Sequence, residues 1–181
     1  MSPTPTFAES TFVLRMRDAS FFATDLFREG FGSAFPKPHD GALLAIPTPR
    51  ESWHQYVAFY KWSDANVEPV AFINYIRFEN VYLEGGVCAR RNFYRRLPAE
   101  HWRECKSRGG IVQIVMEQAM RELDDADAWF GHTSNQPAWQ VGERIGYQIT
   151  AHPYLIVKWF RELPETRKRE IENRVNSIGA F

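Results

Sequence analysis

Residues 127–147 read DAWFGHTSNQPAWQVGERIGY, and this stretch decides the fold. Its first part, Asp127 to His132, holds an apolar and aromatic run that is typical of a β-strand. Three residues of the kind that cap helices follow, ending at Asn135, and Pro137 suits a first helical turn. The apolar residues that fall on one face of this helix are Ala138, Val141 and Ile145. The stretch therefore predicts a strand followed by a short amphipathic helix that ends at Gly146.

Composition bounds the class of protein. The chain has 181 residues, of which 44% are hydrophobic and 15% aromatic, as in a folded single domain with a sizeable core. Lys plus Arg equals Asp plus Glu at 22 each, which argues against a nucleic-acid or anionic-membrane binder. Neither a signal peptide nor an apolar run of ~20 residues is recognisable. We expect a cytoplasmic protein with no membrane and no nucleic-acid partner.

Outward from this stretch, the chain alternates between strand and helix patterns, with three consecutive strands in its middle. The expected elements are strands at Thr11–Arg17, Trp53–Trp62, Pro69–Phe78, Val81–Cys88 and Tyr154–Phe160, and helices at Ala19–Phe31, from Pro98, at Ile111–Leu123 and from Pro164. No repeat or linker divides them. The order predicts one domain that combines strands and helices, with three antiparallel strands in its middle.

Two glycine pairs stand out. Gly85-Gly86 lies inside an expected strand, where it is unfavourable unless it marks a bulge or a close approach of backbones. Gly109-Gly110 precedes an expected helix, where convergent N–H groups and the helix dipole suit a phosphate. Arg108 adds a positive charge. The alternative for the second pair is a tight turn without a ligand.

The segment that follows the first strand of the opening stretch also matches a family pattern. The residues Asn135, Ala138, Val141, Ile145, Gly146 and Tyr147 fit N-x-x-A-x-x-(apolar)-x-x-x-(apolar)-G-(F/Y). Together with the element order, this resembles the GCN5-related N-acetyltransferase (GNAT) superfamily over roughly residues 11–160. A tail helix at about 164–178 is extra. The resemblance implies an α/β (α+β) fold with a central mixed, mostly antiparallel sheet that is splayed in the middle and flanked by helices. It also implies acyl-CoA as co-substrate, no metal, and a small-molecule or peptide amine as acceptor.

The same resemblance implies where the cofactor binds. The Gly85-Gly86 bulge would free backbone groups for the pantetheine arm, and the loop that begins at Ser107 would hold the pyrophosphate. That loop departs from the family's (Q/R)-x-x-G-x-(G/A) at Ser107 and Val112. The cofactor-binding residues so implied are Val87, Cys88, Ala89, Ser107, Arg108, Gly109, Gly110, Ile111, Val112 and Asn135.

Amine acylation also needs a base. Glu84, just before the glycine pair, and His132, at the end of a strand and titrating near neutral pH, are the candidates. An exposed strand charge is the alternative for Glu84, and a capping or buried histidine for His132. A weaker hypothesis is that Cys88 acts as a nucleophile, with His132 as its base. Gly142 stands where many relatives carry a tyrosine, which indicates a bulky substrate or a lost activity.

Three functional hypotheses therefore remain open. The first is an N-acyltransferase. The second is a catalytically silent domain that binds an acyl-CoA or a protein. The third is an interaction module that uses the basic segment Arg90–Lys106 and the tail helix. An apolar stripe on that helix packs within the chain or forms a homodimer, and it comprises Ile171, Val175 and Ile178.

Overall fold

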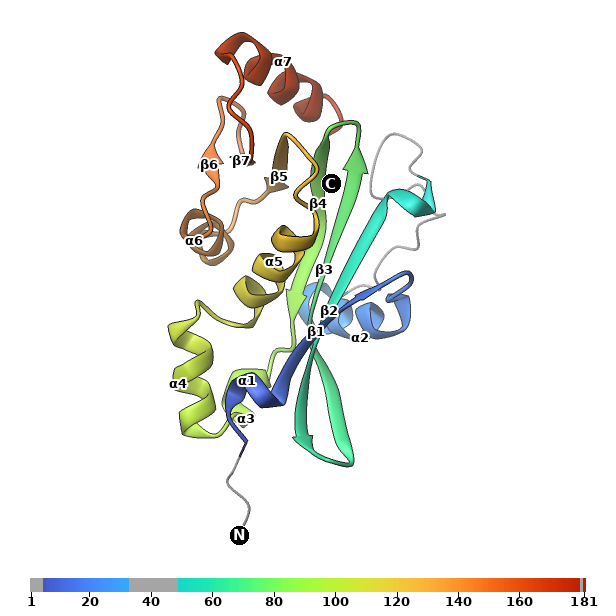
Figure 1. Cartoon of the computed structure of the whole chain (residues 1–181), viewed down its shortest axis with the longest axis vertical. Helices are drawn as coiled ribbons and strands as arrows, with labels where there is room; N and C mark the ends of the chain where they lie inside the picture. The colour runs from blue at the N-terminus through green and yellow to red at the C-terminus, as the bar shows by residue number, and fades with distance from the viewer. Residues whose placement is uncertain (1–4, 33–48, 180) are drawn as a thin grey trace. The chain divides into compact units, whose positions relative to one another are not determined.

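A computed structural model describes residues 5–32, 49–179 and 181. Seven strands form one sheet, and Figure 1 follows them in chain order from blue to red. The strands are β1 (Thr11–Met16), β2 (Trp53–Ser63), β3 (Asn66–Phe78), β4 (Val81–Ala89), β5 (Ala128–His132), β6 (Gln148–Ile149) and β7 (Leu155–Trp159). The helices are α1 (Phe7–Ser10), α2 (Ser20–Phe31), η1 (Arg50–Ser52, 3-10), α3 (Phe93–Arg96), α4 (Ala99–Ser107), α5 (Ile111–Glu122), α6 (Gln136–Arg144) and α7 (Glu165–Asn176).

The order of strands in the sheet is β1-β2-β3-β4-β5-β7-β6. β1 pairs antiparallel with β2, and β7 pairs antiparallel with both β5 and β6. β4 and β5 form a parallel pair. A parallel pair needs a crossover connection, and here it contains α3, α4 and α5. The mixed, mostly antiparallel sheet with flanking helices confirms the predicted fold class.

The chain groups into two compact units, and β2, β3 and β4 run through both. The first unit holds α1, β1, α2, α3, α4 and nearly all of α5, around a core that includes Phe7, Leu26 and Phe93. A buried hydrogen bond of 2.6 Å joins the Tyr60 hydroxyl to His101 Nδ1 in this unit.

The second unit holds β5, α6, β6, β7 and α7. Its core contains the fully buried rings of Tyr75 and Trp129, whose centroids lie 4.2 Å apart. The apolar stripe of the tail helix is buried by the chain itself, at Ile171, Val175 and Ile178. Of the two alternatives, packing within the chain is therefore the observed one.

The opening stretch folds for the reasons that its sequence indicates. The Asn135 side chain caps α6, because its Oδ1 accepts a hydrogen bond of 3.0 Å from the Ala138 amide. Pro137 lies in the first turn, and Gly146 follows the helix with a φ of 95°, which favours glycine. The predicted strand, cap and helix are confirmed.

Three short elements differ from the prediction. α3 and β6 lie in segments for which the sequence predicted neither a helix nor a strand. α1 precedes the first strand and starts with a capping box between Thr6 and Glu9. Within the described part of the chain, no helix is long and apolar enough to cross a bilayer.

Candidate functional site

The sheet parts between β4 and β5. Their pairing covers Val81↔Ala128, Tyr82↔Trp129 and Leu83↔Phe130, and it stops there although both strands continue. From Glu84 onward the backbone of β4 is therefore not bonded to β5. This is the splay in the middle of the sheet that the glycine pair and the family resemblance predicted.

The two glycines at the parting are needed for different reasons. A Cβ on Gly85 would lie 2.7 Å from Asn74 Nδ2 and 2.8 Å from Ile76 Cδ1, so a side chain at this position would have to displace both. Gly86 has a φ of 118°, a conformation that L residues rarely adopt. The first glycine therefore permits a close approach of β3, and the second permits a local irregularity in β4.

Replacing Gly85 with alanine is expected to lower the free energy of unfolding by about 1–3 kcal/mol, because the added methyl overpacks Asn74 and Ile76. Urea denaturation monitored by circular dichroism measures this change. Gly30→Ala is the matched control, because its Cβ would meet only Cys88 Cβ at 3.6 Å and alanine favours the helix. Equal stability of the two variants would contradict the close approach.

Glu84 is a half-buried carboxylic acid at the parting. Its Oε2 lies 3.6 Å from the position that a Cβ on Gly131 would take, so the side chain reaches toward β5. Burial raises the pKa of Glu84 to about 7. The buried Tyr147 hydroxyl is close enough for the Glu84 charge to raise its pKa, after burial as the main cause. Glu84 can therefore exchange a proton near neutral pH.

His132 lies elsewhere. It is exposed at the end of β5, and its ring centroid lies 6.0 Å from that of Tyr154 and 6.1 Å from that of Phe181. Since successive strand residues point to opposite faces, His132 points away from the face on which Glu84 meets Gly131. The structure does not bring the two candidate bases together.

The expected pyrophosphate loop is partly closed by its own hydrogen bonds. The amide of Arg108 donates to Glu104 O, that of Gly109 to Lys106 O, and that of Gly110 to Cys105 O. These bonds terminate α4, with φ angles of 80° at Gly109 and 96° at Gly110. Ser107 Oγ also donates to Glu104 O, at 2.8 Å. The glycine pair thus serves as a helix C-terminal cap.

Tyr94 is a further residue of this loop, and sequence reasoning missed it. Its hydroxyl accepts a hydrogen bond of 3.1 Å from the Ile111 amide, the first of α5. Ile114 donates to Gly110 O, so the chain itself also uses this amide of the first turn of α5. The available signal in the sequence was an aromatic residue within an arginine-rich segment.

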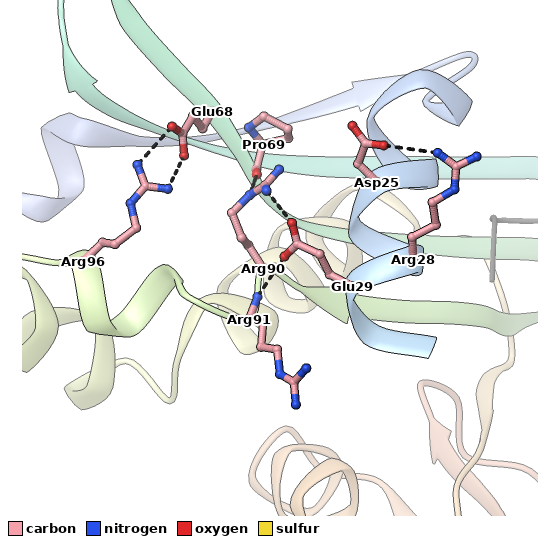
Figure 2. Close-up of polar contacts among 8 residues, drawn as sticks. All are labelled: Asp25, Arg28, Glu29, Glu68, Pro69, Arg90, Arg91 and Arg96. Carbon is pink, nitrogen blue, oxygen red and sulfur yellow. Dashed lines mark hydrogen bonds and ion pairs between the residues drawn. The ribbon is translucent and has the colours of Figure 1, made fainter. Parts of the chain in front are cut away.

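Several arginines of the segment Arg90–Lys106 bind this segment to other residues of the first unit, as Figure 2 shows. Arg90 donates to Glu29 Oε1 at 2.6 Å and to the Pro69 carbonyl at 2.9 Å. Arg96 makes a bidentate pair with Glu68, at 2.7 and 3.0 Å. Arg91 contacts Glu29 through its backbone amide, while its guanidinium points away. The charges of Arg90 and Arg96 are therefore structural.

The remaining cofactor candidates lie at the end of β4 and at the start of α6. Val87, Cys88 and Ala89 end β4, and burial, reinforced by the Glu29 charge, raises the pKa of the Cys88 thiol to about 12. Cys88 is therefore protonated at neutral pH and does not suit a nucleophile. Asn135 uses its Oδ1 to cap α6, beside a surface pocket of about 250 Å³ that Trp139 also lines.

The space beside Gly142 is filled by the protein. A Cβ there would lie 3.4 Å from Ile156 Cδ1 and 3.6 Å from Tyr147 Cβ. These are ordinary van der Waals distances, so the packing accepts a methyl group and does not by itself require glycine. A bulky substrate and a lost activity both stay predictions for this position. Among the described residues, no cluster of three or more His, Cys, Asp or Glu is placed to hold a metal.

Solved structures share this fold. An aminoglycoside 6'-N-acetyltransferase complexed with coenzyme A superposes with a TM-score of 0.54 at 11% identity, over 85% of this chain and 99% of that chain. The PaiA N-acetyltransferase of Thermoplasma acidophilum in complex with coenzyme A superposes with a TM-score of 0.52 at 8% identity, over 83% of this chain and 99% of that chain. The ribosomal-protein-S18-alanine N-acetyltransferase of Escherichia coli superposes with a TM-score of 0.51 at 10% identity, over 86% of this chain and 97% of that chain.

No protein-family model matches the sequence, and no curated protein matches it either. At these identities the structural likenesses establish the fold. The chain has the GNAT fold, as its sequence pattern predicted.

Proposed function

We propose that this GNAT-fold chain is an N-acyltransferase that moves an acyl group, in the simplest case acetyl, from acyl-CoA to a primary amine. The observation that carries the proposal is the half-buried Glu84, with a pKa of about 7, at the point where β4 parts from β5. Neighbours of the same fold are N-acetyltransferases, and two of them hold coenzyme A. The acceptor is a small-molecule or peptide amine in the cytoplasm, and no metal takes part.

The reaction is a direct attack in a ternary complex. Glu84 takes a proton from the ammonium group, and the free amine attacks the thioester carbonyl. A carbon–nitrogen bond forms and the carbon–sulfur bond breaks. CoA leaves as the thiolate and takes up the second proton, which the attacking nitrogen loses. Among the backbone amides of Val87, Cys88 and Ala89, those that point to the β5 edge of β4 stabilise the oxyanion by about 3 kcal/mol per donor.

The loop from Ser107 to Val112 holds the pyrophosphate in this proposal. The positive end of α5 attracts the phosphates, and Arg108, which is exposed, adds a charge. Asn135 orients the donor from the start of α6. Because Tyr94 accepts from the Ile111 amide, a pyrophosphate competes with that hydroxyl for one of the loop's donors.

Tyr94→Phe is expected to tighten CoA binding about 3- to 10-fold, because it releases the Ile111 amide. Calorimetric titration with CoA measures this change. Binding of pantetheine, which lacks the pyrophosphate, should not change. Tyr82→Phe, which removes a hydroxyl bonded to Asp125 Oδ1, is the matched control. Weaker CoA binding by the Tyr94 variant alone would mean that the hydroxyl helps to bind the ligand.

A catalytically silent, CoA-binding domain is the second candidate, and the hydrogen bonds that use the amides of Gly109, Gly110 and Ile111 favour it. A panel of acyl-CoA donors, incubated with an amine library and read by mass spectrometry, tests both candidates. The transferase predicts CoA binding with turnover, and the silent domain predicts binding alone. If neither CoA binding nor turnover is detected, the interaction module is the hypothesis that remains.

A further inference from the structure

Asn74 is a buried polar residue in the middle of β3. Its exposed fraction is 0%, and neither its Nδ2 nor its Oδ1 has a hydrogen-bond partner among the described residues. The carboxamide lies directly over Gly85, because a Cβ on that glycine would approach Nδ2 to 2.7 Å. Asn74 thus lies beside the first residues of β4 that are not bonded to β5.

An unpaired carboxamide in this position is costly. Buried donors and acceptors are almost always hydrogen-bonded, and leaving one unpaired destabilises the fold. An apolar residue with the same branching and number of heavy atoms, such as leucine, would avoid this cost. The residue is therefore explained if a group absent from the free protein completes its hydrogen bonds.

The two faces of β4 indicate which group this is. On one face of β4, the Glu84 side chain reaches toward Gly131. On the opposite face, the Asn74 carboxamide fills the space that a side chain on Gly85 would take. The amine that Glu84 deprotonates lies on the first face. A ligand that Asn74 contacts at the parting of the strands is then the donor and not the acceptor.

We infer that Asn74 is a binding residue for the acyl donor, and that its carboxamide pairs with an amide of the pantetheine arm. A carboxamide presents one acceptor oxygen and one donor nitrogen, and an amide of the arm presents the complementary N–H and C=O. This inference rests on the proposed function, because it takes CoA as the ligand.

The test is Asn74→Leu, titrated with CoA by calorimetry and unfolded by heat without ligand. We expect CoA to bind at least about tenfold more weakly, because one or two buried hydrogen bonds are lost. The melting temperature of the free protein should rise by about 3 °C, because the unpaired carboxamide is removed. Asn173→Leu, on the exposed side of α7, is the matched control and should leave CoA affinity unchanged.

The outcomes separate the two proposals. CoA affinity equal to that of the wild type would overturn the inference and leave the proposed function standing, with a buried water as the partner of Asn74. Wild-type protein that does not bind CoA would overturn both. If Asn74→Leu does not fold, Asn74→Ser, which adds no volume beside Gly85, decides by the same criterion of CoA affinity.

Discussion

Replacing Glu84 with glutamine is expected to lower kcat/KM for acyl transfer by a factor of about 10²–10⁴, the usual contribution of a general base. Glutamine keeps the shape of the side chain and cannot accept the ammonium proton. The rate of CoA release from acetyl-CoA, with an amine found in the acceptor screen, measures the loss. CoA affinity should stay within about twofold, since the variant removes no hydrogen bond to the donor.

The pH dependence gives an independent measure. With a pKa of about 7, the Glu84 carboxyl is protonated and inactive as a base below pH 7, and it becomes active above it. The wild-type kcat/KM should therefore rise through pH 7, and this rising limb of the pH profile should be absent from the glutamine variant. His132→Gln should keep the limb, because His132 points to the other face. Loss of the limb in the histidine variant instead would make His132 the base.

The same group links stability to pH. Folding raises the Glu84 pKa from an ordinary value of 4.5 to about 7, so the folded protein binds more protons than the unfolded chain between these values. The contribution of Glu84 to stability is complete below pH 4.5 and is lost as the pH rises to 7. At pH 8 the glutamine variant should be more stable than the wild type by up to about 3 kcal/mol. Thermal unfolding at pH 5 and pH 8 measures the difference.

Local patterns in the sequence were enough for much of the fold. The cap at Asn135, the proline in the first turn and the glycine at 146 act within a few residues of α6, so they can be read without tertiary structure. The pair Gly85-Gly86 also predicted an irregularity in β4, because few other arrangements tolerate two glycines in a strand. The division into domains stays a prediction.

The site was less predictable, because its features depend on contacts between distant segments. Tyr94 meets the Ile111 amide across 17 positions, and nothing local to either residue indicates the pair. In the sequence, Asn74 is a single polar residue in an apolar strand. Only the structure shows that its carboxamide lies against Gly85. His132 and Glu84 both suit a base by residue type, and only the strand register assigns them to different faces.

Val112→Asp tests the pyrophosphate loop through charge. Val112 is half-buried in the first turn of α5, next to Ile111, whose amide donates to the Tyr94 hydroxyl. A carboxylate there would face the phosphates at a distance near 4 Å, where like charges repel by about 4 kcal/mol. CoA affinity should therefore fall by a factor of at least about 100, as measured by calorimetry.

The same substitution should not harm the fold, which separates binding from stability. An acidic side chain in the first turn of a helix interacts favourably with the dipole, by about 0.3–1 kcal/mol. Val112→Asn, of similar size and without charge, is the control, and it should reduce CoA affinity far less than the aspartate. Pantetheine affinity should be the same in both variants. Equal losses of CoA affinity with asparagine and aspartate would show that packing at Val112 matters, and the loop would then not be the phosphate site.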